Sequence, residues 1–148
     1  LPAFAGDGRD AITLRMLMTH TSGLAAGRGS LQLYRQADAL AWALARPLQE
    51  PPGAAQRYNN VGVMVLGGVV ERLAGRPLGR YVRDRVFAPL CVRDFTWRGD
   101  RAGHSFAPGD LAMSGRDLAR VGQLVLDHGR WHGTPVIDSA WLDAATWR

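Results

Sequence analysis

A serine and a histidine lie two residues apart near the start of the chain, in the run Thr19-His20-Thr21-Ser22-Gly23. A hydroxyl activated by an imidazole is a common pair for attack on an amide or ester carbonyl. Residues this close in sequence rarely meet in the geometry of a catalytic triad, whose members come from distant segments. Serine, threonine and glycine are instead typical of turns with local side-chain hydrogen bonds. We therefore predict a structural turn here, and not a nucleophile.

The other reactive side chains show no pattern for self-contained catalysis. The sequence has no G-x-S-x-G elbow, no H-E-x-x-H, no C-x-x-C and no Gly-rich phosphate loop. The four histidines lack the spacing of metal ligands, so we expect surface or capping roles for them, and neither metal nor cofactor: His20, His104, His128 and His132. The single cysteine, Cys91, lies in an apolar stretch, which favours a buried, unreactive thiol.

The charge distribution argues against a nucleic-acid binder, although the formal net charge is +5. The basic residues are spread along the chain. The densest group, Arg80, Arg83 and Arg85, has the spacing of the solvent side of a helix. No apolar run approaches the roughly 18 residues that a membrane span requires. We expect neither a nucleic-acid partner nor a membrane span in this segment.

Helical periodicity dominates the elements that must position these residues. Apolar spacing predicts helices over residues 12–20, 31–45, 61–74, 78–88 and 114–129, with a last helix from 138 or 139. Thr13 and Ser114 are the expected N-caps of the first and fifth. The helix over 61–74 is apolar on every side, so we expect it to be buried, with its glycines packed closely against neighbours. Residues 90–113 are expected to be irregular.

The run from Ile12 to Leu24 carries a more specific signal. Its sequence, ITLRMLMTHTSGL, is similar to the I-T-(I/L)-R-x-L-L-T-H-T-S-G-L segment of serine β-lactamase-like hydrolases. Tyr58-Asn59-Asn60, which begins 35 residues beyond Gly23, resembles the Y-x-N motif of the same family. A lone Y-x-N would carry no weight, but the two patterns occur here in the order that the family shows.

Two later segments extend the resemblance over almost the whole chain. Phe87-Ala88-Pro89-Leu90 follows the apolar helix, and residues 116–124, RDLARVGQL, are similar to the family's R-D-L-A-R-F-G-Q-L helix. Residues 129–133, GRWHG, together with Trp141, favour the class C-like branch of esterases and 6-aminohexanoate-dimer hydrolases. The chain therefore resembles part of a penicillin-recognising serine hydrolase, a member of the serine β-lactamase and DD-peptidase superfamily.

The resemblance implies roles for two residues. In that family a serine is acylated by a carbonyl group and water then clears the acyl-enzyme. Tyr58 matches the tyrosine that shares the base's task with the lysine of S-x-x-K. A phenol, with an ordinary pKa of about 10, can do this only where positive charge stabilises the phenolate. Asn60 would present its amide to the substrate and to that lysine, and Asn59 would be a spacer that points away.

The same residues also allow plainer roles. Tyr58 could pack beneath the loop Pro51-Pro52-Gly53. Asn60 could be the N-cap of the apolar helix, with or without a part in substrate binding. The residue types alone leave both alternatives open.

The amino-acid composition shows that this chain cannot contain the whole active site that the resemblance implies. All 18 cations are arginine, and without a lysine there is no S-x-x-K motif. The chain begins Leu1-Pro2 and stops at Trp147-Arg148, within a predicted helix, so we expect an internal segment with both ends truncated. The resemblance places S-x-x-K before it and the K-T-G or H-x-G strand after it. It thus implies the helical part of an α+β, β-lactamase/transpeptidase-like domain over residues 1–148, with most of the antiparallel sheet missing.

Two functions are compatible with this interpretation. The first is a serine hydrolase that, in the complete protein, acts on a small-molecule amide, ester or β-lactam. The second is a non-catalytic relative that has kept the fold as a binding or sensor domain. The presence of S-x-x-K in the complete protein discriminates between them.

Overall fold

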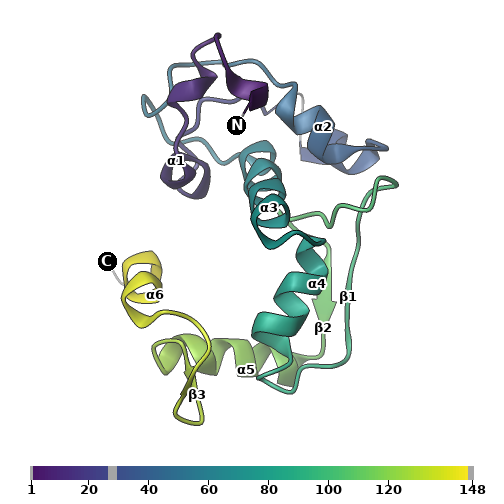
Figure 1. Ribbon diagram of the computed structural model, residues 1–148, viewed down its shortest axis with the longest axis vertical. Coiled ribbons are helices and arrows are strands. Elements are labelled where there is room, and N and C mark those ends of the chain that lie inside the picture. Colours follow the sequence, from purple (N-terminus) through teal and green to yellow (C-terminus); the bar gives the residue numbers. More distant parts are fainter. Residues whose placement is uncertain (1, 27–29, 147–148) are drawn as a thin grey trace. The chain divides into compact units, whose positions relative to one another are not determined.

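The computed structural model describes residues 2–26 and 30–146, which are mainly helical, as the sequence predicts (Figure 1). The α-helices are α1 (Leu14–Met18), α2 (Ala39–Leu44), α3 (Asn60–Ala74), α4 (Leu78–Val82), α5 (Gly115–Leu126) and α6 (Ser139–Thr146). Short 3-10 helices cover Pro2–Phe4, Arg9–Ala11 and Ser30–Arg35, and a π-helical turn over Arg83–Phe87 continues α4. The strands are β1 (Phe95–Trp97), β2 (Leu111–Met113), β3 (Arg130–Trp131) and β4 (Thr134–Pro135), in two antiparallel pairs.

These elements group into two compact units. The first comprises Leu1–Leu78 and Arg98–Asp110, and the second comprises Gly79–Trp97 and Leu111–Arg148. Each unit has its own cluster of buried apolar side chains. The expectation of a single partial domain over residues 1–148 stays a prediction, and the two units are described separately.

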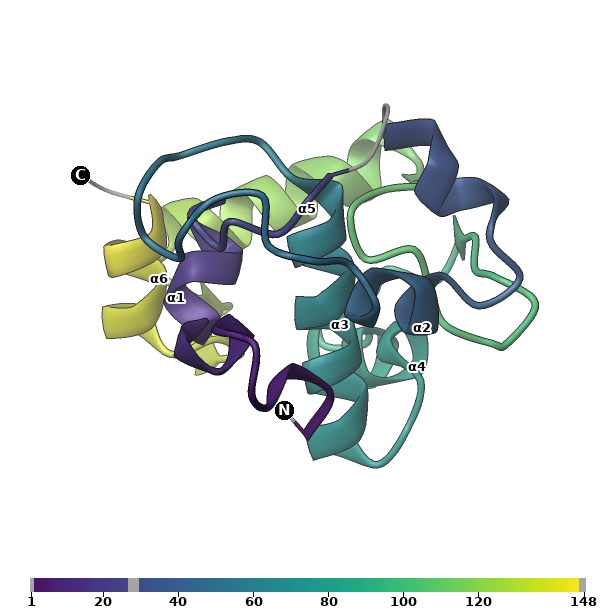
Figure 2. The same ribbon diagram turned by 90° about the horizontal axis from the view of Figure 1, so that it is seen from above.

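Helix α3 is the centre of the first unit, with α1 and α2 on opposite sides of it (Figure 2). Close packing of its glycines is confirmed, because a Cβ atom at Gly67 would lie 2.6 Å from the Cβ of Ala107 and one at Gly68 would collide with Leu40. The expectation of burial holds only for the first half of the helix. Val61, Met64 and Val65 are buried, whereas Leu73 is 80% exposed.

The predicted helix over residues 31–45 is wrong in its middle. A 3-10 helix ends at Arg35, and α2 begins afresh after Asp38, whose extended backbone and side chain form an N-cap. The Asp38 carboxylate accepts the N–H of Ala41 at 2.7 Å. A second carboxylate, that of Asp100, accepts the N–H of Ala39 at 2.7 Å from 61 residues away. This long-range bond fixes the helix start at a place that apolar spacing cannot indicate.

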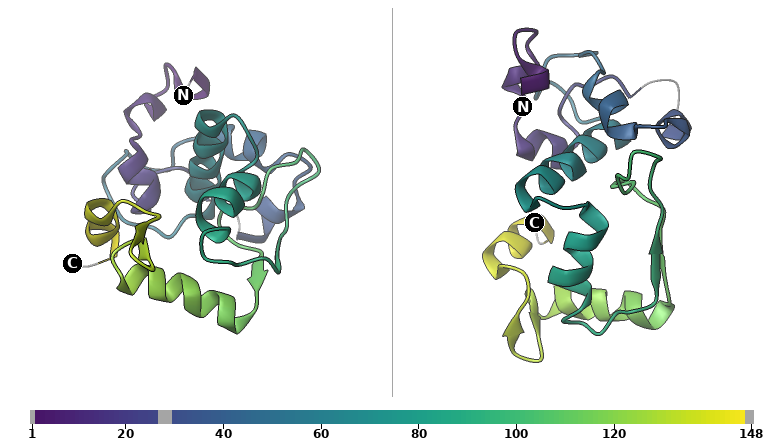
Figure 3. Two further views of the ribbon diagram at one scale, coloured as in Figure 1. Left: turned by 60° about the horizontal axis from the view of Figure 1, so that its bottom comes forward. Right: turned by 45° about the vertical axis from the view of Figure 1, so that its right-hand side comes forward.

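In the second unit the predicted helix caps and the predicted solvent-facing arginines are confirmed. Figure 3 shows α5 followed by the hairpin of β3 and β4 and then by α6. Ser114 caps α5 as predicted, accepting the N–H of Asp117 at 3.1 Å, and Asp138 caps α6 through the N–H of Trp141 at 2.8 Å. Arg80, Arg83 and Arg85 are exposed, as their spacing predicts: the arginine side of the helix faces solvent.

Two predictions for residues 90–113 are wrong. The segment is not irregular throughout, because β1 and β2 pair in antiparallel register, with Thr96 opposite Ala112. Three-residue strands are too short to show alternation in the sequence. Cys91 is exposed and not buried. The chain turns there with a φ of +54°, and its neighbours Leu90 and Val92 occupy the inside positions instead.

Within the part of the chain that the structure describes, no helix has the length and apolar character needed to cross a membrane.

Candidate active site

The turn after α1 is held together by its own side chains. Thr19 donates its hydroxyl to the carbonyl of Arg15 at 2.9 Å, and its oxygen lies 3.0 Å from that of Thr21. Ser22 is 1% exposed, and its oxygen accepts the N–H of Leu24 at 3.5 Å. The prediction of a structural turn is confirmed, since a buried serine occupied with its own loop is not placed to attack a substrate.

This turn also holds the segment that leads to Tyr58 through backbone hydrogen bonds. The N–H of Gly53 donates to the carbonyl of Thr21, and that of Gln49 to the carbonyl of Gly23, both at 2.8 Å. Gly23 has a φ of +72°, and a Cβ atom there would collide with the carbonyl oxygen of Glu50. Glycine is therefore required where the two segments touch. These hydrogen bonds join the turn of the first sequence pattern, residues 12–24, to the segment that leads to the second, residues 58–60.

Asn59 anchors the start of α3 to the same turn. Its Oδ1 accepts the N–H groups of Val61 at 2.9 Å and Gly62 at 3.4 Å, and its Nδ2 donates to the carbonyl of Leu24 at 2.6 Å. The residue is only 5% exposed. The alternative that Asn60 caps this helix is wrong, because Asn59 is the N-cap and Asn60 is the first helical residue.

Tyr58 lies on the outside of this anchor. It is 73% exposed, which contradicts the alternative that it packs beneath the Pro51-Pro52-Gly53 loop. Its ring lies beside that of His20, with 4.9 Å between the centroids and 42° between the planes. A solvent-facing phenol held against an imidazole is available to exchange a proton with a bound group.

Asn60 is the first residue of α3, and its side-chain oxygen is buried. Its Oδ1 is inaccessible to solvent and finds no hydrogen-bond partner among the residues described in the structure. Buried amide oxygens almost always accept a hydrogen bond. Asn60 Oδ1 therefore lacks a donor among the described residues, two positions along the chain from the exposed phenol.

The cation next to Tyr58 in the sequence is already paired with a carboxylate. That cation, Arg57, pairs its Nε with the Glu50 carboxylate at 2.7 Å. Burial raises the pKa of Tyr34, and the negative charge of Asp110 raises it further.

The other histidines are occupied elsewhere. His104 Nδ1 lies 2.5 Å from Glu71 Oε2 in the first unit, and His128 Nδ1 lies 2.6 Å from Asp143 Oδ1 in the second. His132 is exposed in its turn, as predicted. Over residues 2–26 and 30–146, no group of three or more His, Cys, Asp or Glu side chains is arranged to hold a metal ion.

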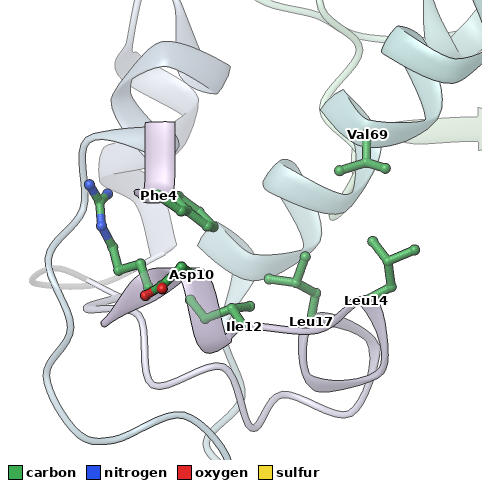
Figure 4. Close-up of a pocket in the computed structure, with 7 residues that line it drawn as sticks. Phe4, Asp10, Ile12, Leu14, Leu17 and Val69 are labelled. Carbon is green, nitrogen blue, oxygen red and sulfur yellow. The ribbon is translucent and has the colours of Figure 1, made fainter. Parts of the chain in front are cut away.

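A hollow in the first unit lies between α1 and α3 and does not include Tyr58 or Asn60. Figure 4 shows Leu14 and Leu17 of α1 and Val69 of α3 facing one another across it. Among the described residues of its lining, Arg9 and Asp10 carry the charges. The Arg9 guanidinium donates to the carbonyls of Leu44 and Arg46, so it braces the loop and is not directed at a ligand.

Comparison with known proteins identifies the family. The model of the beta-lactamase family matches residues 1–147, so this chain belongs to that family. This confirms the resemblance found in the sequence. Solved structures of similar proteins match this mainly helical chain over part of their own length, which confirms the predicted fold class.

Individual relatives agree with this assignment. The 6-aminohexanoate-dimer hydrolase of Paenarthrobacter ureafaciens is 34% identical over 89 residues, which are 60% of this chain and 23% of that protein. Among solved structures, the D-stereospecific amidohydrolase from Streptomyces sp. has a TM-score of 0.71 at 24% identity, over 98% of this chain and 54% of that one. The octameric penicillin-binding protein homologue from Pyrococcus abyssi has a TM-score of 0.73 at 17% identity, over 89% and 37%. The chain spans about a quarter of the length of the curated relatives that it matches first.

Sequence reasoning missed the parts played by Asn59 and His20. Asn59 was expected to be a spacer, yet it is the buried N-cap of α3. A signal existed, because Asn is a strong N-cap residue at either position of an Asn-Asn pair that precedes an apolar helix. His20 was expected to have a surface or capping role, and its contact with the Tyr58 segment arises only from the folding of the chain.

Proposed function

We propose that this chain supplies the tyrosine and asparagine side of a hydrolase site that acts on an amide, ester or β-lactam carbonyl through an acyl-serine intermediate. In this proposal Tyr58 is the base and Asn60 positions the substrate. One observation carries it. The exposed phenol of Tyr58 and the buried amide oxygen of Asn60, which has no hydrogen-bond partner among the described residues, flank the buried residue Asn59 in the sequence. Membership of the beta-lactamase family supports the same chemistry.

The proposed reaction assigns one proton to this chain, which receives it and passes it on. A serine oxygen bonds to the carbonyl carbon while its proton passes to the Tyr58 phenolate oxygen. The bond from the carbonyl carbon to the leaving amine or alcohol then breaks, and that group takes up the proton from the Tyr58 hydroxyl, which restores the phenolate. Water then hydrolyses the acyl-serine. The phenolate requires nearby positive charge. Because these 148 residues include no lysine, a lysine that supplies this charge must belong to another part of the protein.

The first experiment separates the hydrolase from the binding or sensor alternative. The gene is sequenced on both sides of the codons for this chain, and the complete protein is treated with a fluorescent penicillin and with a fluorophosphonate. An S-x-x-K motif together with covalent labelling supports the hydrolase. A complete protein that lacks the motif and takes up neither label is a binding or sensor domain.

The second experiment tests Tyr58 itself. In the complete protein, Tyr58→Phe should slow acylation by about 10²-fold, because general-base catalysis commonly contributes a factor of this order. Tyr81→Phe is the matched control, since it removes the same hydroxyl from a tyrosine in the second unit and should leave acylation unchanged. Stopped-flow measurement of acyl-enzyme formation gives both rates. A Tyr58→Phe protein that acylates at the normal rate removes Tyr58 from the role of base.

A further inference from the structure

His20 holds the chain on both sides of Tyr58. Its carbonyl oxygen accepts the N–H of Arg57 at 2.8 Å, and its Nδ1 accepts the N–H of Asn59 at 3.2 Å. Its ring contacts the ring of Tyr58 itself. One residue of the first sequence pattern thus touches three successive residues of the second, 37 to 39 positions away.

The bond from Asn59 fixes the chemical state of the imidazole. A backbone N–H can only donate, so Nδ1 must be the acceptor and carries no proton. The ring proton then lies on Nε2. The Nδ1 edge of the ring therefore faces the backbone of the Y-x-N segment.

The backbone of His20 is adapted to this contact. Its φ is +59°, in the left-handed region that few residues other than glycine adopt. His128 and His132 share this conformation, but they lie in the second unit, at the end of α5 and in the β3–β4 turn. Residues held in this region persist where their surroundings determine the conformation, and such positions are common at functional sites.

We infer that His20 is a positioning residue that sets the direction of the Tyr58 phenol through the hydrogen bond from Asn59 N–H to His20 Nδ1. This inference rests on the proposed function. Asn59 fixes the segment from the inside, where its side chain is buried. His20 fixes it from the side on which the phenol is exposed. Without the Nδ1 acceptor the phenol would occupy a wider range of directions, and a base displaced by about 1 Å can lose much of its effect.

Three substitutions separate the features of His20. His20→Asn keeps an acceptor near the position of Nδ1 and tolerates the left-handed backbone, but loses the ring. His20→Phe keeps a ring against Tyr58 and loses the acceptor. His20→Gly loses both and relaxes the backbone. His132→Gly is the matched control, because it removes a histidine with the same left-handed backbone from the β3–β4 turn, which supplies no residue to the proposed site.

The variants are compared in the complete protein with p-nitrophenyl acetate, a small ester. His20→Phe and His20→Gly should lower kcat about tenfold with KM changed less than about twofold, while His20→Asn stays within about threefold of the parent. His132→Gly should match the parent. Hydrogen exchange at the backbone amide of Asn59 should accelerate in His20→Phe and His20→Gly and not in His20→Asn.

A second background shows whether His20 acts through Tyr58. In a Tyr58→Phe protein, adding His20→Gly should lower kcat by no more than about twofold, because the group that His20 positions is already absent. A full tenfold further loss there overturns the inference, as does a His20→Asn protein as slow as His20→Gly. Should His20→Gly fail to fold, the contrast between His20→Asn and His20→Phe still decides.

The outcomes also distinguish this inference from the proposed function. If Tyr58→Phe is slow while every His20 variant keeps the parent's kcat, the positioning role is wrong and the base assignment stands. If Tyr58→Phe acylates normally, the proposed function fails, whatever the His20 variants show.

Discussion

The two longest helices of the chain begin in different ways. At the start of α5, Ser114 caps Asp117, and the Asp117 carboxylate in turn receives Ser114 Oγ at 3.0 Å and Arg120 Nη1 at 2.7 Å. Those partners lie within seven residues. At the start of α3, the cap Asn59 is buried and bonds to Leu24, and its own N–H reaches His20.

The difference separates two uses of the same cap. The α5 cap satisfies a free N–H group at a helix end within its own helix, and the long-range bond of its network, from Arg120 Nη1 to the carbonyl of Cys91, does not involve the cap residue Ser114. The α3 cap also satisfies free N–H groups of its own helix, and in addition it joins two segments that are more than 30 residues apart in sequence. An N-cap that carries a tertiary connection can hold the side chains on either side of it, here Tyr58 and Asn60, in fixed positions.

The largest expected loss of stability is therefore at Asn59. Asn59→Ala should lower the free energy of unfolding by about 2–4 kcal/mol, because it removes the cap and also leaves the carbonyl of Leu24 without its donor. Urea denaturation of the complete protein measures the change. Asn59→Ser, which keeps a cap oxygen and lacks the amide donor, should lose about half as much.

The α5 cap should matter less. Ser114→Ala should lower the free energy of unfolding by about 1 kcal/mol, the usual cost of a lost N-cap, since Arg120 still pairs with the Asp117 carboxylate. Ser114→Thr is the control and should stay within about 0.5 kcal/mol of the parent. Equal losses for Asn59→Ala and Ser114→Ala would contradict the distinction between a local cap and a tertiary one.

The same distinction explains which features of the fold the sequence predicts. Thr13 and Ser114 were found because a cap and its N–H partner lie three residues apart, inside one visible pattern. Helix α3 was found because its apolar residues extend over four turns. The break before α2 was missed because it depends on Asp100, and the pairing of β1 with β2 was missed because thirteen residues separate the two short strands.

The candidate site divides along similar lines. The patterns that include Tyr58 and Asn60 are visible in the sequence, since each is a short local motif, and the family assignment based on them is confirmed. The choice between Asn59 and Asn60 as the cap could not be made from residue types, because both are asparagines. The part of His20 could not be predicted either, since the bond from Asn59 to His20 exists only once the turn is packed against the Tyr58 segment.

The smallest expected change in stability is at Tyr58, directly beside the residue with the largest. Tyr58→Phe should change the free energy of unfolding by less than about 0.5 kcal/mol, because the ring stays in place and the lost hydroxyl belongs to a side chain that is 73% exposed. Thermal and urea denaturation of the same preparations used for acylation provide the measurement. A tyrosine kept for packing should show the opposite pattern, with stability lost and rate unchanged. A loss above about 1 kcal/mol together with an unchanged acylation rate would therefore place Tyr58 with Asn59 among the structural residues of this turn, and would leave Asn60 as the one residue of the motif with a proposed part in substrate binding.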